Sequence, residues 1–254
     1  MVDIHSHILP GWDDGSKSLE ESLAMLRIAV ESGTRAIVAT PHANSDFPFR
    51  SDTVNQLFSQ LKEAANGIID LHLGSDFHIE FENVQDALAH PTKYTIDHGA
   101  YLMVELPDVM NVAIIRDILN RLRDAGMVTV ITHPERNQQM QTQIAELRRW
   151  VEEGALLQVT GQSLLGRFGR SAQQCANALL KEDLVHFIAS DAHDTRDRTP
   201  DLSGAYRWMQ SKFGKERAER LFKTNPADLL RGETVQSEAD AAGQAQKSWW
   251  AFWK

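Results

Sequence analysis

The amino-acid sequence predicts an α/β fold in which a single domain forms a distorted (β/α)7 barrel of the TIM type. Short apolar runs alternate with helical patterns, which is typical of a parallel sheet built from βα units. The length of 254 residues suits such a barrel, which needs about 250. Histidines or carboxylates directly follow six of the runs, as in barrel enzymes whose site lies at the strand ends. A doubly wound open sheet is the alternative.

The apolar runs are expected to form about seven strands, with an error of two to four residues at each boundary. The first run begins at the N-terminus, and the others recur after each helical pattern. They cover Val2–Ile8, Arg35–Thr40, Asp70–Asp76, Ala100–Glu105, Met127–Thr132, Ala155–Thr160 and His186–Asp191.

Helices are expected between the strands. The first has a start signal, because Ser18 as N-cap with Glu21 three residues later matches a capping box, and it stops at Gly33. Gly126 and Gly154 end two later helices in the same way. The expected helices are Ser18–Ser32, Asp52–Asn66, Val112–Ala125, Thr142–Glu153 and Ser171–Lys181, with short helices over Ala205–Arg231 closing the domain.

The composition changes after Gly232, so we divide the chain into a domain over residues 1–231 and a tail over 232–254. Glu233–Lys247 is polar and typical of a mobile linker. Three interpretations of the aromatic end stay open. It packs on the barrel or on a second subunit, it is disordered, or it anchors the protein at a membrane interface, which tryptophan favours. Its aromatic residues are Trp249, Trp250, Phe252 and Trp253.

Composition excludes several classes of protein. The 26 basic and 35 acidic residues give a net charge of −9, which argues against a general nucleic-acid-binding surface. The single cysteine, Cys175, excludes an intramolecular disulfide framework. It also lacks the C-x5-R pattern of cysteine phosphatases, and we expect it to be a buried small hydrophobe. With neither a run of roughly 20 apolar residues nor a signal peptide before His5, the protein is expected to be cytoplasmic.

The residues after the apolar runs are metal-ligand types. His5 and His7 converge because residues i and i+2 of a strand share a face, as do Asp191 and His193 if the extended geometry continues. The candidate set exceeds the four to six ligands of one ion, so two or three metals are implied. Mixed nitrogen and oxygen ligands suit Mn, Fe or Zn. The candidates are His5, His7, Asp14, His42, Asp76, Glu105, His133, Asp191 and His193.

The charge balance of this site favours phosphate chemistry. Four ligand carboxylates contribute about −4 and three divalent ions about +6, so the centre is cationic. Arg136 and Arg198 lie a few residues past ligand positions and are candidates for clamping phosphate oxygens. The expected reaction is attack on phosphorus by a metal-activated hydroxide, with the arginines holding the charge of the transferred group.

Structural roles compete with some of these assignments. Asp13 adjoins Asp14 in what could be a plain turn, and Arg196 competes with Arg198. Glu80 and Glu82 compete with Asp76, and Glu135 could equally be a surface carboxylate. The remaining histidines fit the strand-end pattern poorly and are interpreted as structural: His72, His78, His90, His98 and His186.

Five motifs together resemble the PHP (polymerase and histidinol phosphatase) superfamily, and more narrowly its bacterial CpsB/CapC-type tyrosine-protein phosphatases of capsule and exopolysaccharide synthesis. The resemblance runs in order from about Met1 to Arg231. The motifs are Asp3-Ile-His-Ser-His7, Asp13-Asp-Gly15, Thr40-Pro-His42, His133-Pro-Glu-Arg136 and Ile188-Ala-Ser-Asp-Ala-His193.

The resemblance implies a PHP-type (β/α)7 barrel with three metal ions, usually manganese. Arg136 and Arg198 match the phosphate-binding arginines of that branch. The family usually has Glu where this chain has the bridging Asp76, and the shorter side chain is expected to alter the spacing or affinity of the metals. By motif, one ion would have His5, His7, Asp76 and Asp191 as ligands, a second Asp76, Glu105 and His133, and the third Asp14, His42 and His193.

The substrate implied by the resemblance is phosphotyrosine on a tyrosine autokinase that governs polysaccharide export. One alternative is a small-molecule phosphatase such as histidinol phosphatase, although that branch tends to have histidines at the positions of Asp14 and Glu105. A nuclease is disfavoured by the charge of −9. The third alternative is a non-catalytic scaffold that binds the kinase and the membrane through the aromatic tail, which a degenerate ligand set would favour.

Overall fold

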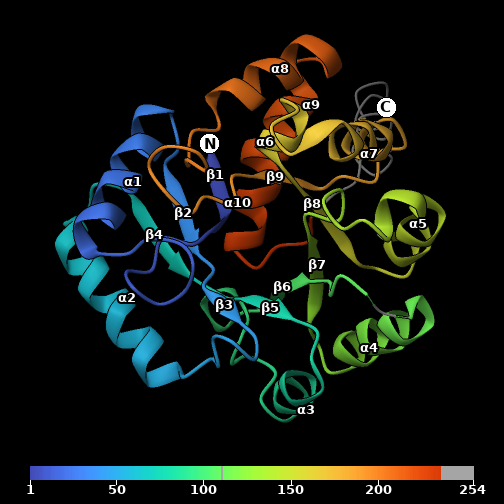
Figure 1. The fold of residues 1–254 in the computed structure, drawn as a ribbon, viewed down its shortest axis with the longest axis horizontal. Helices are drawn as coiled ribbons and strands as arrows, with labels where there is room; N and C mark the ends of the chain where they lie inside the picture. Colours follow the sequence, from blue (N-terminus) through green and yellow to red (C-terminus); the bar gives the residue numbers. More distant parts are fainter. Residues whose placement is uncertain (110, 236–254) are drawn as a thin grey trace, which may run out of the picture.

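The computed structural model describes residues 1–109 and 111–235, and over these ranges the chain forms a closed barrel of parallel strands ringed by helices (Figure 1). Two of the seven strand positions are each made of two consecutive short strands, β2 with β3 and β4 with β5. The strands are β1 Val2–Ser6, β2 Ala36–Ala39, β3 His42–Ala43, β4 Asp70–Leu73, β5 Asp76–His78, β6 Tyr101–Glu105, β7 Val128–Thr132, β8 Leu156–Thr160 and β9 Phe187–Ala189.

The barrel closes between its first and last strands. Neighbours in one sheet run β1-β2-β4, and in the other β3-β5-β6-β7-β8-β9. Ser6 forms an isolated parallel bridge with Ala192. The amide of His7 donates to the carbonyl of Ala192 at 2.8 Å, and that of Asp191 donates to the carbonyl of His5 at 2.9 Å. The expected barrel is therefore observed, and the open doubly wound sheet is wrong.

The helices surround the strands, as Figure 1 shows. Ser18 caps the first helix, as predicted, because its hydroxyl accepts a hydrogen bond from the amide of Glu21 at 3.3 Å. The Glu21 carboxylate accepts from the amide of Lys17 instead of the amide of Ser18, so the capping box is incomplete. The helices are α1 Leu19–Glu31, α2 Ser51–Ala65, α3 Phe81–Ala89, α4 Val112–Asp124, α5 Ile144–Glu152, α6 Gly161–Leu164, α7 Gly169–Lys181, α8 Ser203–Phe213, α9 Lys215–Glu219 and α10 Asn225–Leu230. Shorter helical turns are η1 Ile96–His98, η2 Met140–Thr142 and the π-helical η3 Arg220–Thr224.

Several elements differ from the sequence-based expectation. The strand expected over Asp70–Asp76 is interrupted after Leu73, and a new strand begins at Asp76. The last strand ends at Ala189 because Asp191 has a left-handed backbone with φ of 52°. Helix α3 and strand β3 were not expected, since both are short and lie between stronger patterns.

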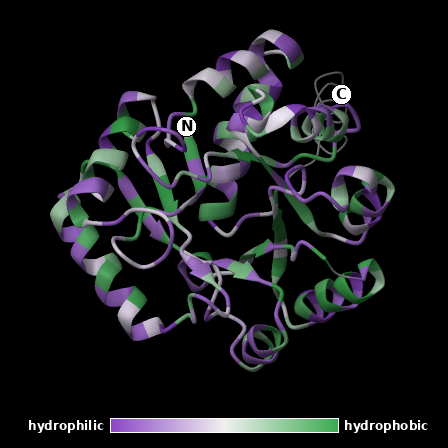
Figure 2. Ribbon diagram, in the orientation of Figure 1, coloured by the Kyte–Doolittle hydropathy of each residue, from purple (hydrophilic) through white to green (hydrophobic). Residues whose placement is uncertain are grey.

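One apolar cluster fills the inside of the barrel, and two others lie between the strands and the helices. The inner cluster takes residues from strands all around the barrel, including Ile4, Val38, Met103, Val130 and Phe187, and Leu229 of α10 packs against them. In Figure 2 the strands carry mostly apolar residues, and polar residues appear on the helices and loops. The barrel interior is thus a packed core, which leaves the site to the strand ends.

Strand β1 contains a bulge directly before the site. Asp3 pairs with Ile37 and Ser6 with Ala39, so β1 has one residue more than β2 between these pairs. Bulges re-aim side chains and are frequent beside active sites. Oδ1 of the buried Asp3 accepts from the amides of His5 at 3.4 Å and Ser190 at 2.9 Å. Asp3 therefore supports both the bulge that carries His5 and the closure against the last strand.

The start of the predicted tail contacts the barrel. The Tyr101 hydroxyl donates to the carbonyl of Glu233, and Val235 belongs to the inner apolar cluster. Residues 236–254, with the linker and aromatic end interpreted above, lie outside the described residues. Within the described part of the chain, no helix has the length and apolar character that crossing a membrane requires.

The pKa of Asp3 gives a prediction about stability. Burial raises it to about 6, although hydrogen bonds from Ser190 and His5 oppose the rise. A carboxyl with a raised folded-state pKa stabilises the protein below its unfolded pKa, and this contribution is lost as pH rises through the folded pKa. We expect the unfolding free energy of metal-free protein to fall by about 1 kcal/mol relative to Asp3→Asn between pH 5 and pH 7.5. Urea unfolding measures this, and identical pH dependence of the two proteins would contradict it.

Candidate metal centre

The barrel brings all nine candidate ligands to one end, where the strands finish. His5 lies near the end of β1, and His42, Asp76 and Glu105 lie on β3, β5 and β6. The others lie in the loops that follow the strands: His7 and Asp14 after β1, His133 after β7, and Asp191 and His193 after β9. Their ligand atoms fall into four overlapping groups, and within each group they lie within 4.8 Å of one another.

One group surrounds Asp14 at the rim of the site. Its Oδ1 lies 3.4 Å from Nε2 of His42 and 3.4 Å from Nε2 of His193, and His7 completes the group. The Asp14 side chain is 55% exposed, whereas that of His193 is 6% exposed. This group therefore faces the solvent through its carboxylate.

Two of the other three groups share Asp76, which is fully buried, and the third consists of His5, His133 and Asp191. Asp76 Oδ2 lies 3.5 Å from His5 Nε2 and 3.5 Å from His42 Nδ1, and 4.0 Å from Nε2 of both His7 and His133. The aspartate therefore reaches the middle of the imidazoles despite being one methylene shorter than a glutamate.

Glu105 joins the Asp76 group from the next strand. Its Oε2 lies 3.5 Å from His42 Nδ1, and its Oε1 lies 3.7 Å from His133 Nε2. Asp191 closes the opposite side, with Oδ1 3.4 Å from Nε2 of both His5 and His7.

These spacings fit divalent ions better than direct hydrogen bonds. Hydrogen bonds between nitrogen and oxygen measure about 2.7–3.2 Å, and these pairs are longer. Two ligand atoms that each lie about 2.1 Å from one tetrahedral ion are separated by roughly 3.4 Å. In addition, His42 Nδ1 and Asp76 Oδ2 are buried without a hydrogen-bond partner among the described residues. The donor set and its spacing therefore fit divalent metal ions.

Residues that sequence reasoning missed hold several ligands in place. Asp13 Oδ2 lies 2.9 Å from His7 Nδ1 and accepts from the amide of His42 at 2.9 Å. Gln158 Oε1 lies 2.9 Å from His5 Nδ1, so both imidazoles present Nε2 to the centre. The Thr132 hydroxyl donates to Asp76 Oδ1 at 3.2 Å. Partners of this kind fix the orientation of metal ligands. Only Asp13 had a sequence signal, its position beside Asp14.

Two ligands have unusual backbone conformations. Asp191 has φ of 52° and His133 has φ of 32°, in the left-handed region that non-glycine residues seldom adopt. Such strain concentrates at functional sites, where the surrounding structure enforces it. The expectation that Asp191 and His193 converge on an extended strand is therefore wrong. They approach, with 3.6 Å between Asp191 Oδ1 and His193 Nδ1, because the chain turns at Asp191.

Arg136 and Arg198 meet at the same carboxylate oxygen. Arg136 Nη1 and Arg198 Nη2 both donate to Asp191 Oδ2, the latter at 2.5 Å. Arg198 is held by a turn in which the Asp194 side chain accepts from its amide, whereas Arg196 is exposed. Arg198 rather than Arg196 therefore lies at the site. Its Nε is buried and has no hydrogen-bond partner within the described ranges.

Without bound metal, neighbouring charges shift the pKa values of the site residues in opposite directions. Burial lowers the pKa of His7, but the charge of Asp13 outweighs it and raises that pKa well above the ordinary value. Burial raises the pKa of Asp191, but the charges of His5 and both arginines bring it well below the ordinary value. Burial and the charge of Arg136 lower the pKa of His133 to about 3. The neutral imidazole of His133 is the form that binds metals.

Two hollows flank the ligand groups. One, of about 330 Å³, is acidic and is lined by Asp14, Glu105, Asp46 and Asp108 with His42 and His78. The other, of about 540 Å³, is lined by Arg136, Phe168, Gln138, Gln141, Ser171 and Ala172. The first hollow therefore repels an anion, and the second attracts one.

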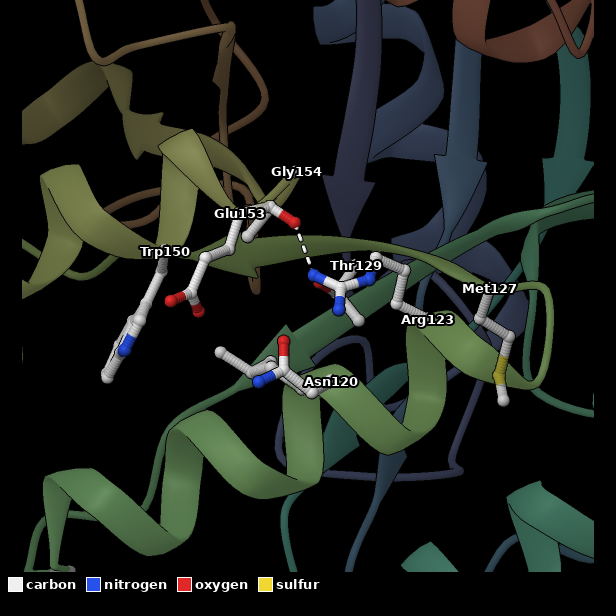
Figure 3. Close-up of a pocket in the computed structure, with 9 residues that line it drawn as sticks. Asn120, Arg123, Met127, Thr129, Trp150, Glu153 and Gly154 are labelled. Carbon is white, nitrogen blue, oxygen red and sulfur yellow. Dashed lines mark hydrogen bonds between the residues drawn. The ribbon is translucent and has the colours of Figure 1, made fainter.

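A third depression lies away from this chemistry. Figure 3 shows it between α4 and α5, where Arg123 donates to the carbonyl of Glu153. Its volume of about 10 Å³ suits at most one water molecule.

The competing assignments are resolved by position. Glu82 is exposed and Glu80 lies 3.4 Å from His78, so neither joins a ligand group. The surface role for Glu135 is wrong, because it is buried and accepts from the amide of Thr160 and the hydroxyl of Ser163. Cys175 is buried in α7, as predicted. None of the five histidines interpreted as structural belongs to a ligand group in the described part of the chain: His72, His78, His90, His98 and His186.

Comparison with known proteins identifies the family. The family model described as capsular polysaccharide synthesis, CpsB/CapC, matches residues 1–231. The chain belongs to the CpsB/CapC family. It is 34% identical to the tyrosine-protein phosphatase YwqE of Bacillus subtilis over 92% of this chain and 93% of that protein. The tyrosine-protein phosphatase CpsB of Streptococcus agalactiae serotype III is 30% identical, over 92% of this chain and the full length of the relative.

A solved structure supports the same membership. It belongs to a study of YwqE from Bacillus subtilis and CpsB from Streptococcus pneumoniae, described there as unique metal-dependent tyrosine phosphatases. It superposes on the present structure with a TM-score of 0.85 at 32% sequence identity, and the match covers 94% of this chain and 97% of the solved one. The barrel fold therefore supports the same family as the sequence motifs.

A close backbone approach at Gly15 yields a prediction. A Cβ at this position would lie 2.2 Å from the carbonyl oxygen and 2.4 Å from Cβ of His7, so Gly15→Ala must displace His7. We expect it to lose bound metal, measured by elemental analysis, and to destabilise the protein by about 1–3 kcal/mol. Gly204→Ala is the control, because its Cβ would make an ordinary contact at 3.4 Å. Full metal content in Gly15→Ala would contradict the expectation.

Proposed function

We propose that this chain is a metal-dependent protein-tyrosine phosphatase that hydrolyses phosphotyrosine on a protein substrate. The observation that carries the proposal is Asp191, whose Oδ1 faces His5 and His7 while its Oδ2 binds Arg136 and Arg198. One carboxylate thus contacts both the proposed metal ligands and the two arginines proposed to bind phosphate. Membership in a family whose relatives are named tyrosine-protein phosphatases supports the same activity.

We propose three divalent ions as cofactors, with manganese preferred over iron or zinc. When bound, they supply an acidified water as nucleophile and positive charge toward the phosphoryl group. Asp76 is proposed as a bridging ligand because its Oδ2 lies among four imidazoles. The proposed ligands are His5, His7, Asp76 and Asp191 for one ion, Asp76, Glu105 and His133 for the second, and Asp14, His42 and His193 for the third.

The arginines orient the phosphate in this proposal. Their side chains are about one quarter exposed, whereas Asp191 between them is buried. Guanidinium groups bind phosphate oxygens through paired N–H donors, and Arg198 Nε is a donor without an internal partner within the described ranges. They stabilise the charge of the transferred group as the bond to the leaving oxygen breaks.

The substrate we propose is phosphotyrosine. His5 and Asp76 are fully buried, whereas Arg136 and Arg198 are about one quarter exposed, so the arginines meet the phosphate of a protein-bound tyrosine first. Tyrosine is also a good leaving group, because its phenol has a pKa of about 10 and the phenolate leaves without strong acid assistance.

The partner we propose is a tyrosine autokinase that controls capsular or exopolysaccharide synthesis, which fits the family's link to capsular polysaccharide. Residues 1–231 are proposed as the catalytic domain, since the family model covers this range. The tail is proposed to contribute no catalytic group, because all ligands and both arginines precede it.

A substrate panel tests the activity. Protein loaded with Mn²⁺ should hydrolyse a phosphotyrosyl peptide faster than histidinol phosphate, and chelation of the metal should stop both reactions. His5→Ala and Asp191→Ala should each abolish turnover and lose metal, because each removes a buried ligand that packing cannot replace. His90→Ala, an exposed histidine outside the ligand groups, is the matched control. Preference for histidinol phosphate, or full turnover in either ligand variant, would overturn the proposal.

The arginine assignment has its own test. Arg198→Ala should raise KM for the phosphotyrosyl peptide by about tenfold to a hundredfold, the effect of one charged hydrogen-bond donor, with metal content unchanged. Arg196→Ala removes an exposed arginine two residues away and should change neither quantity. Loss of metal in Arg198→Ala would show that the residue supports the ligands instead of the phosphate.

A further inference from the structure

Phe168 lies against both phosphate-binding arginines. The guanidinium carbon of Arg136 lies 4.4 Å from the centre of the Phe168 ring, and that of Arg198 lies 5.9 Å from it. Both distances fall within the roughly 6 Å range of cation–π attraction. One aromatic ring therefore contacts two cations that converge on a single carboxylate oxygen, Asp191 Oδ2.

Packing and helix capping do not account for this phenylalanine. It is absent from the three apolar clusters of the described residues and from the side chains packed against them. It occupies the N-cap position of α7 but makes no capping bond through its side chain, and aromatic residues are not favoured there. Its ring borders the hollow beside Arg136.

The turn that carries Phe168 is tied to both arginine loops. Gly166 and Gly169, on either side of it, have φ of 78° and 87°, so the turn needs glycine at both positions. In the preceding α6, Ser163 donates to Glu135 at 2.7 Å, next to Arg136. Gln162 donates to the carbonyl of Asp197 at 3.0 Å, next to Arg198. Helix α6 therefore links the turn that carries Phe168 to the loops that carry both arginines.

The Phe168 ring offsets part of the repulsion between the two guanidiniums. Two guanidiniums on one oxygen repel each other, and Asp191 is the one carboxylate among the described residues that forms an ion pair with both, although Glu135 and Glu105 also attract Arg136. The face of an aromatic ring carries partial negative charge and attracts cations without offering a hydrogen-bond acceptor. Phe168 can therefore hold the arginines together while leaving their remaining N–H donors for a ligand.

We propose that Phe168 is a positioning residue that pre-orients Arg136 and Arg198 for the phosphate group. The inference rests on the proposed phosphatase function and extends it to a residue outside the ligand groups. Phe168 acts through the arginines rather than by touching the substrate. Its loss should therefore weaken the binding of any phosphate ligand, including one that has neither ring nor peptide.

Binding of inorganic phosphate to the Mn²⁺-loaded protein, measured by calorimetry, tests this. Phe168→Leu keeps an apolar side chain but removes the ring, and should raise the Kd of phosphate by about three- to tenfold. Phe168→Tyr retains the ring and should stay within about twofold of the wild type. Leu165→Ala, in the same turn, is the matched control and should leave the Kd unchanged. Metal content and melting temperature should not change in any of the three.

A double-mutant cycle separates positioning from general damage. In an Arg136→Ala, Arg198→Ala background, Phe168→Leu should have no further effect on phosphate affinity, because the groups through which it acts are gone. An unchanged Kd in Phe168→Leu, equal losses in Phe168→Leu and Phe168→Tyr, or a loss of affinity for phosphotyrosyl peptide alone would each overturn the inference. Because phosphate binding is measured without turnover, failure of the proposed function, seen as no hydrolysis of phosphotyrosine, is distinguished from failure of this inference, seen in the Kd of phosphate.

Discussion

The centre depends on a single buried carboxylate that serves two kinds of partner. Asp191 presents Oδ1 to the Nε2 atoms of His5 and His7 at 3.4 Å and Oδ2 to Arg136 and Arg198. Because a carboxylate is rigid, this arrangement fixes the distance between the ligand groups and the guanidinium pair. In the proposed function, a phosphoryl group held by these arginines lies next to the proposed metal ligands. In this proposal, phosphate binding and the metal-assisted attack take place at adjacent positions.

The fold keeps Asp191 in a conformation it would not adopt by itself. Its left-handed backbone is unfavourable for a side chain with a Cβ, and a surrounding network has to enforce it. The amide of Asp191 donates to the carbonyl of His5, and the preceding amide of Ser190 donates to Asp3. The bonds that close the barrel are therefore the same bonds that shape the site. Stability and function are coupled at the seam between β1 and β9.

The sequence was sufficient for the barrel and for the residue types that gather at its end. Apolar runs and their flanking ligand residues are local patterns, so His5, His7 and His42 could be selected without a structure. Supporting contacts could not, because they join distant positions: Gln158 orients His5 from 153 residues away. The bulge in β1 depends on pairing with β2, and Phe168 gains its role only beside two arginines. Nothing local distinguishes such residues from ordinary core or turn residues.

The seam also has a consequence for biosynthesis. The ligand groups draw on positions from His5 to His193, so a ribosome must release most of the chain before the pocket can exist. Because the last strand docks against the first, no earlier fragment contains the complete set of donors. The complete set of donors can therefore assemble only after β9 and the loop that follows it have been synthesised, which places formation of the full site late in the maturation of the chain.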